Sequence, residues 1–182
     1  MKMRQVEKRF VNGTRHSLRV AERAEQLVRM ADPEAGQRLL DVGCGNGAAA
    51  VRLARTLGLE VAGVDIDPEQ IDAAVEASTD LAAVRFLVAD ATHLPFAEGE
   101  FDLVHTSKTM HHVREWQLAL AEMARVLRPG GQLLYNDFVA PLGGRFPTRR
   151  GLDRFAIAHQ LELVWRSSAP LHCTAIFRNA RS

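Results

Sequence analysis

Residues 39–50 read LLDVGCGNGAAA, and this stretch decides how the rest of the chain is interpreted. An apolar run ends at Asp41, three glycines then alternate with other residues, and alanines begin a segment with helical spacing. Glycine permits the positive φ angles of a sharp turn, and the first amides of a helix have no partners within that helix. The stretch therefore predicts a buried strand, a glycine loop and a helix start that bring backbone close to a ligand.

Strand-like and helical segments alternate after this stretch. We expect strands at residues 38–42, 60–64, 84–89, 103–106 and 132–136, and helices at 48–57, 68–78 and 116–127. Such alternation predicts an α/β fold, a doubly wound parallel sheet with helices on both faces. A short helix is expected at 152–159. Two further strands, at 161–166 and 172–178, are joined by a tight turn, which predicts an antiparallel hairpin because a parallel pair needs a longer crossover.

An amphipathic segment precedes the alternating pattern. Apolar residues recur at helical spacing within residues 14–30, with Arg and Glu on the opposite face. We expect residues 1–36 to form a helical cover, either a lid over a cleft or a fixed packed element. The length of 182 residues suits one domain, so residues 37–182 are expected to form it.

The composition is that of an ordinary globular protein, with 47% hydrophobic and 25% charged residues. The two cysteines, Cys44 and Cys173, form no CxxC pair and have no histidine at ligand spacing, so neither a disulfide framework nor a metal site is indicated. No apolar run is long enough to cross a bilayer. We therefore expect a cytoplasmic protein without a membrane partner.

The net charge of +1 is unevenly distributed. Residues 1–38 carry a net charge of +4, residues 39–137 a net charge of −8 and residues 138–182 a net charge of +5. The basic ends could form a rim for an anionic substrate or a nucleic acid, or they could be solvated surface. The absence of aromatic residues among the basic ones favours solvated surface.

Aspartates end the first three expected strands, at Asp41, Asp65 and Asp90. In an open parallel sheet, ligands bind at the carboxyl ends of the strands. Asp65 lies 18 residues after Gly47, where a doubly wound fold brings an acid to the ribose hydroxyls of a nucleoside. Asp67 precedes Pro68 and is expected to cap a helix instead.

The glycine spacing discriminates between nucleotides. Folds that bind a pyrophosphate use GxGxxG, whereas this loop is GxGxG with Asp41 two residues before its first glycine. A carboxylate at that position would repel a pyrophosphate and suit an ammonium group. The loop therefore disfavours a nicotinamide-dependent oxidoreductase.

Four segments together resemble the class I S-adenosylmethionine-dependent methyltransferases. They are LLDVGCGNG, VAGVDIDPEQI, VADATHLPFAEGEFDLV and ALAEMARVLRPGGQLL, and the similarity runs from about residue 38 to residue 177. The resemblance implies a Rossmann-like sheet of seven strands in the order 3-2-1-4-5-7-6, with the seventh strand antiparallel. It also implies the cofactor S-adenosyl-L-methionine, with S-adenosyl-L-homocysteine as product.

The resemblance implies a row of cofactor-binding residues: Asp41, Gly43, Cys44, Gly45, Asp65, Ile66, Asp90, Ala91 and Thr106. Asp41 and the loop backbone would hold the methionine part, and Asp65 the ribose. Ile66 would pack on the adenine, whose edge Asp90 and the Ala91 amide would recognise.

Methyl transfer requires an aligned acceptor and, for a protonated acceptor, removal of its proton. The methyl group should lie near residues 105–113, HTSKTMHHV, where the candidates are Ser107, Met110, His111 and His112. His111 or His112 would be the general base, or the two would only cap backbone groups. Further candidates for binding the acceptor are Asn136 and Asp137, unless Asp137 merely ends a strand, and Arg145, Arg149 and Arg150 on the following loop.

We therefore expect a methyltransferase that acts on an O, N or C atom of a small molecule, as a monomer or homodimer. The alternatives are an RNA or protein methyltransferase that docks through its basic ends, and a non-catalytic S-adenosylmethionine-binding regulatory protein. The chain lacks the N/D-P-P-Y/F sequence that similar enzymes use on planar amino groups, and the Pro-Cys nucleophile of cytosine C5 enzymes.

Overall fold

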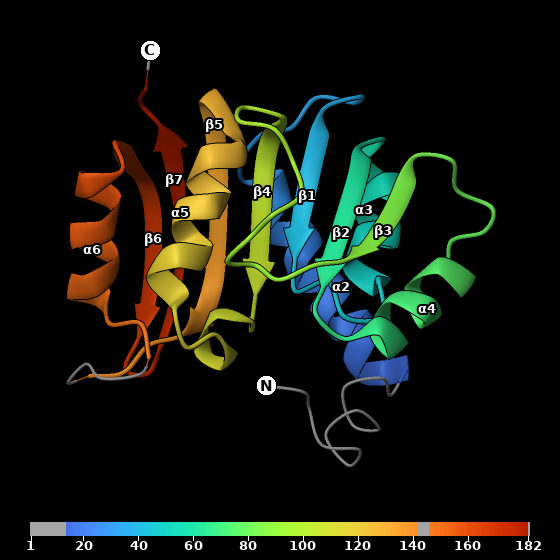
Figure 1. The fold of residues 1–182 in the computed structure, drawn as a ribbon, viewed down its shortest axis with the longest axis horizontal. Coiled ribbons are helices and arrows are strands. Elements are labelled where there is room, and N and C mark those ends of the chain that lie inside the picture. Colours follow the sequence, from blue (N-terminus) through green and yellow to red (C-terminus); the bar gives the residue numbers. More distant parts are fainter. Residues whose placement is uncertain (1–13, 142–145, 182) are drawn as a thin grey trace.

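A computed structural model of the protein describes residues 14–141 and 146–181 (Figure 1). The elements are α2 (Thr14–Arg29), β1 (Arg38–Val42), α3 (Ala48–Leu57), β2 (Glu60–Asp65), α4 (Pro68–Glu76), β3 (Val84–Val88), β4 (Phe101–Ser107), the short 3-10 helix η1 (Met110–His112), α5 (Trp116–Val126), β5 (Leu127–Phe138), α6 (Arg149–Ala158), β6 (Leu161–Ala169) and β7 (His172–Asn179). The strands form a seven-stranded sheet in the order β3-β2-β1-β4-β5-β7-β6. β1 to β5 pair in parallel, and β7 is antiparallel to both β5 and β6. The expected strand order and terminal hairpin are confirmed.

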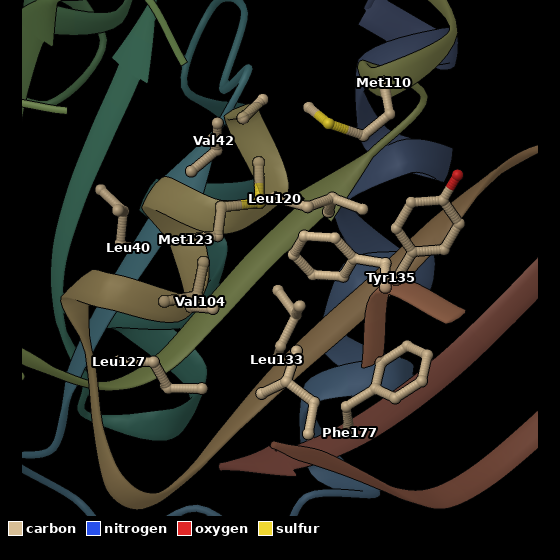
Figure 2. Packing of buried hydrophobic residues seen from close by; sticks show 14 of the residues in the cluster. Leu40, Val42, Val104, Met110, Leu120, Met123, Leu127, Leu133, Tyr135 and Phe177 are labelled. Carbon is tan, nitrogen blue, oxygen red and sulfur yellow. The ribbon is translucent and has the colours of Figure 1, made fainter. Parts of the chain in front are cut away.

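Helices cover both faces of the sheet, as expected. Neighbouring residues of a strand point to opposite faces, and β1 shows this clearly. Leu40 belongs to a buried cluster with Leu120 of α5 (Figure 2). Leu39 belongs to a second cluster with Val28 of α2 and Leu53 of α3. The two clusters form the core on the two sides of the sheet.

Local sequence signals account for several helix ends. Gly58 adopts φ 66°, and its amide donates to the Ala54 carbonyl at the end of α3. Asp67 caps α4 by accepting a hydrogen bond from the Glu69 amide at 3.1 Å, and Pro68 occupies the first turn. Both features follow the expected chemistry of a glycine C-cap and an aspartate N-cap.

The junction between α5 and β5 differs from the expected helix at 116–127 and strand at 132–136. α5 ends at Val126, and Leu127 is already extended and begins β5. Leu127 pairs with Phe101 of β4, whereas the next pairing joins Gln132 to Leu103. The intervening residues are extra on β5 and form an irregularity in the ladder.

α6 begins at Arg149, earlier than the expected residue 152. The Thr148 side chain accepts a hydrogen bond from the Gly151 amide at 2.9 Å and caps the helix. Arg149 and Arg150 therefore lie in the first turn of α6 and not on a loop. The Arg149 guanidinium donates to the Ala169 carbonyl at the end of β6.

α2 is packed on α3, and its inner face is part of the core. Glu25 of α2 forms ion pairs with Arg29 and with Arg52 of α3. Gln132 of β5 donates to the Ala31 carbonyl just after α2, at 3.0 Å. The part of the expected cover before residue 14 lies outside the described residues. Within the described ranges, no helix is both long and apolar enough to cross a membrane.

Candidate active site

A cavity of about 600 Å³ lies at the carboxyl ends of β1, β2, β3 and β4, with residues of α2 in its wall. These strand ends face the lower edge of the sheet in Figure 1. Its lining includes ten of the eleven residues expected to bind the cofactor or to act as the general base: Asp41, Gly43, Cys44, Gly45, Asp65, Ile66, Asp90, Ala91, His111 and His112. These ten residues come from four segments of the sequence, which meet where a doubly wound sheet is expected to bind its ligand.

The loop after β1 needs its glycines for two reasons. Gly43, Gly45 and Gly47 have φ angles of 77°, 53° and 75°, a region that side chains rarely adopt. A Cβ atom at Gly43 would also lie 2.1 Å from the Thr109 hydroxyl oxygen, and one at Gly47 would lie 2.6 Å from the Phe86 ring. The loop therefore brings bare backbone to the cavity, as expected.

Asp65 at the end of β2 holds the loop. Its Oδ2 accepts from the Gly45 amide and its Oδ1 from the Asp67 amide, each at 3.0 Å. Burial raises the pKa of Asp65, and the two amides partly offset this effect. Each carboxylate oxygen has two acceptor positions, so Asp65 can position the loop and still accept hydrogen bonds from a ligand in the cavity.

Asp90 after β3 is held by Thr92. Its Oδ1 accepts from both the amide and the hydroxyl of Thr92, each at 2.8 Å. These hydrogen bonds lower the pKa of Asp90, the Thr92 amide having the larger effect. The neighbouring Ile66 side chain is half exposed and lines the same cavity. An apolar surface and a fixed carboxylate therefore lie in the part of the cavity expected to hold the adenine ring.

A buried pair that the sequence analysis missed lies at the end of β1. His105 Nδ1 of β4 is 2.8 Å from Asp41 Oδ1, and the two residues are 1% and 3% exposed. Both residues line the cavity. The available signal was a histidine directly after the apolar residues Leu103 and Val104. The β1 to β4 register places this histidine opposite Asp41.

His111 and Asp137 form a second pair. His111 Nδ1 lies 2.6 Å from Asp137 Oδ1, and the His111 amide donates to Asp137 Oδ2 at 3.3 Å. Asp137 also accepts from the Phe138 amide at 2.6 Å and is fully buried. Because a carboxylate only accepts, Nδ1 is the protonated nitrogen and Nε2 is left to act as an acceptor. The His112 ring lies 3.8 Å from the His111 ring, centroid to centroid.

Three of the candidates for the acceptor side do not line the cavity. Asp137 orients His111 and does not line the cavity. Asn136 is bound to the Ser107 and Thr174 hydroxyls and does not line the cavity either. Met110 is completely buried in the core against α5. Of the candidates in this segment, Ser107, His111 and His112 do line the cavity.

Thr106 also differs from its expected role in cofactor binding. It is completely buried, its hydroxyl donates to the Val42 carbonyl at 3.1 Å, and it does not line the cavity although His105 and Ser107 do. Alternation along β4 turns its side chain to the other face. Arg149 and Arg150 lie in α6 and do not line the cavity, and Arg145 lies outside the described residues.

Charged and titratable side chains line the cavity on several of its elements. Asp41, Asp65, Asp67 and Asp90 lie at or close to the ends of β1, β2 and β3, whereas His16, Lys108, His111, His112, Arg114 and Glu115 come from α2 and from the segment after β4. Burial lowers the pKa of His16, and the charges of Lys108, Arg19 and Arg23 lower it further. Among the described residues, no group of three or more His, Cys, Asp or Glu side chains is placed to hold a metal ion.

Comparisons with known proteins agree with this arrangement. A family model described as a methyltransferase domain matches residues 40–135. The 27-O-demethylrifamycin SV methyltransferase of Amycolatopsis mediterranei is 40% identical over 119 residues, which are 63% of this chain and 43% of that protein. The first curated relatives are matched over 42% to 54% of their length, so the chain spans about half of them.

Two solved structures show the same fold. Geranyl diphosphate methyltransferase, solved with S-adenosylmethionine, superposes with a TM-score of 0.78 over 92% of each chain at 17% identity. The 4+2 cyclase SpnF superposes with a TM-score of 0.74 over 81% of this chain and 60% of that chain, at 25% identity. With more than half of its length matched by the family model and its strands in the order 3-2-1-4-5-7-6, the chain belongs to the methyltransferase domain family and has the fold of the class I S-adenosylmethionine-dependent methyltransferases.

Proposed function

We propose that this protein transfers a methyl group from S-adenosyl-L-methionine to a hydroxyl oxygen of a small molecule. The observation that carries the proposal is the His111 and Asp137 pair, which places a histidine oriented as a base in the wall of the same cavity that the strand-end aspartates line. The name of the Amycolatopsis relative describes methylation of an oxygen on a small molecule, which supports the same class of reaction.

The residues on the β1 to β3 side fit the cofactor. Asp41 Oδ2 is buried and has no hydrogen-bond partner among the described residues, which suits an ammonium group. Asp65 would accept hydrogen bonds from the ribose hydroxyls, and Ile66 with Asp90 would flank the adenine. The cavity volume of about 600 Å³ is within the range of small-molecule sites. When bound, S-adenosylmethionine supplies an electrophilic methyl group.

His111 would act as the general base. Asp137 fixes the ring and its tautomer, so Nε2 accepts the proton of the acceptor hydroxyl while Asp137 stabilises the imidazolium that forms. A positioned base of this kind contributes about 10²- to 10⁴-fold to a rate. Asp137 is a positioning residue, because it acts through His111 and does not line the cavity.

The described part of the N-terminal cover would serve as a fixed wall. His16, Ser17 and Val20 of α2 line the cavity, while the opposite end of the helix is joined to α3 by the Glu25 and Arg52 ion pair. Both cysteines are buried and neither forms a disulfide, which suits a reducing compartment. We therefore place the enzyme in the cytoplasm. We expect it to be a monomer or a homodimer.

A labelled-methyl assay against pools of phenols, alcohols, amines and carboxylic acids tests the proposal. We expect label in a hydroxyl-bearing acceptor, and substitution His111→Gln should lower kcat about 10²-fold or more without changing the dissociation constant of S-adenosylhomocysteine. His159→Gln provides the control, because His159 stacks on Phe155 in α6, away from the cavity. Label only in amines or an unchanged kcat in His111→Gln would refute the assignment.

The likeness to a cyclase favours one second candidate, a protein that uses this fold for chemistry other than methyl transfer. In that case the protein would bind S-adenosylhomocysteine in calorimetry, but no pool would be labelled. An RNA methyltransferase would instead show binding to polyanions that weakens steeply as salt is raised.

A further inference from the structure

The floor of the cavity contains two buried polar side chains that the proposed proton transfer does not use. Asp41 lies one residue before the end of β1, and the parallel register places His105 of β4 directly beside it. The Asp41 and His105 side chains are 4% and 1% exposed, and both line the cavity. The pair therefore belongs to the ligand-facing surface although water hardly reaches it.

Each member of the pair has one nitrogen or oxygen atom without a partner. The contact between His105 Nδ1 and Asp41 Oδ1 is a hydrogen bond of 2.8 Å, in which the ring must donate because the carboxylate only accepts. Asp41 Oδ2 and His105 Nε2 are buried and have no hydrogen-bond partner among the described residues. In a neutral ring with its proton on Nδ1, Nε2 is an acceptor. Two open acceptors thus belong to side chains that line the same cavity.

The charge around these atoms selects the kind of donor. Burial raises the pKa of the Cys44 thiol well above its ordinary value, and the negative charges of Asp41 and Asp65 raise it further. Because the Asp41 and Asp65 carboxylates both line the cavity, its floor carries negative charge, and a ligand carboxylate would be repelled there. A cationic group with several N–H bonds could donate to both acceptors and would be attracted by the negative charge.

We propose that His105 Nε2 is a second acceptor for the α-ammonium group of S-adenosylmethionine, beside Asp41 Oδ2. His105 would thereby do two things: Nδ1 orients the Asp41 carboxylate, and Nε2 binds the ligand. The inference rests on the proposed cofactor. It assigns a ligand contact to His105 of β4, a contact that neither the glycine loop nor the strand-end aspartates predict.

The substitution His105→Asn separates the two roles. The asparagine amide nitrogen replaces Nδ1 and can still donate to Asp41, whereas nothing replaces Nε2. His159→Asn is the matched control, since it makes the same chemical change at a histidine that does not line the cavity. Calorimetry is then performed with three ligands: S-adenosylhomocysteine, decarboxylated S-adenosylmethionine, which keeps the amine, and 5′-methylthioadenosine, which lacks the amino-acid end.

We expect His105→Asn to weaken binding of both amine-bearing ligands about 10- to 100-fold, the usual effect of losing one hydrogen bond to a charged group. Binding of 5′-methylthioadenosine should not change, and His159→Asn should bind all three ligands like the native protein. Equal weakening for all three ligands would show a merely structural role, and weakening confined to the ligand with a carboxylate would show that His105 donates to that carboxylate. Either result would overturn the inference.

A second measurement needs no variant and covers the case in which His105→Asn fails to fold. In native protein labelled with ¹⁵N-histidine, the His105 Nε2 resonance should shift on addition of S-adenosylhomocysteine but not of 5′-methylthioadenosine. An Nε2 resonance unmoved by either ligand would refute the inference alone, provided that calorimetry shows both to bind. Failure of the native protein to bind any of the three ligands would refute the proposed cofactor, and the inference with it.

Discussion

Asp137→Asn is the most informative perturbation of the proposed base. The buried Asp137 carboxylate accepts three hydrogen bonds, from the His111 ring at 2.6 Å, the His111 amide at 3.3 Å and the Phe138 amide at 2.6 Å. Asparagine has the same shape but only one accepting oxygen. In one orientation its NH₂ group faces the His111 amide, and in the other it faces the ring and the Phe138 amide. At least one buried N–H group therefore loses its acceptor.

The expected cost follows from this count. One buried unsatisfied donor costs about 1–3 kcal/mol of stability, which for a chain of this size lowers Tm by about 2–4 °C per kcal/mol. We also expect kcat to fall about 10²-fold or more, because the imidazolium that forms during proton removal loses its carboxylate partner. The dissociation constant of S-adenosylhomocysteine should stay within about twofold of the native value, since Asp137 does not line the cavity.

Initial rates with saturating acceptor, thermal melting and calorimetry measure the three quantities on the same samples. Asp153→Asn is the control, because it removes a half-exposed carboxylate that pairs with Arg166 and lies outside the cavity lining. If Asp137→Asn melts several degrees lower but keeps the native kcat, the carboxylate is only structural. That outcome would refute the reasoning that assigns His111 the role of base.

Three other outcomes are expected. Asp65→Ala should weaken binding of S-adenosylhomocysteine by about 1–3 kcal/mol in calorimetry, and an unchanged affinity would show that the ribose does not lie there. Gly43→Ala should lower the free energy of urea unfolding by clearly more than Gly36→Ala, because both positions have positive φ but only a Cβ at Gly43 meets another side chain; equal losses would contradict this account of the loop. Hydrogen bonds from Arg125 hold the pKa of Glu122 below its ordinary value of 4.5, so the ionised carboxylate stabilises the fold above that pH and this stabilisation is lost as the pH falls through the lowered pKa. Glu122→Gln should therefore reduce the free energy of unfolding by about 1 kcal/mol at neutral pH and by much less in acid, and a loss independent of pH would disprove the linkage.

Much of the fold is encoded in short-range patterns. The alternation of apolar runs predicts the doubly wound sheet, and the caps at Gly58 and Asp67 are found where their residue types predict them. The residues expected to bind the cofactor are set equally locally, because each lies at or close to a strand end and the carboxyl ends of parallel strands meet at one edge. For Asp41, Asp65 and Asp90, the position within a single segment is enough to place them in the cavity.

The acceptor side depends on how distant segments align. His105 meets Asp41 across 64 residues, and His111 meets Asp137 across 26. Each of these contacts depends on which strands become neighbours. The contact between His105 and Asp41 also depends on the exact register of β1 and β4. A shift of one residue would reverse the face of every side chain on a strand. Thr106 lies between His105 and Ser107 on β4 and points to the opposite face, so it is buried and does not line the cavity.

The sequence by itself therefore determined the class of fold, the glycine loop and the acids expected to hold the methyl donor, because these are properties of single segments and their ends. Only the tertiary structure decided that Asp137 orients a histidine and that His105 completes the Asp41 end of the cavity. The physical reason is that a hydrogen-bonded pair needs two side chains brought within about 3 Å, and residues far apart in sequence achieve this only once the sheet has assembled.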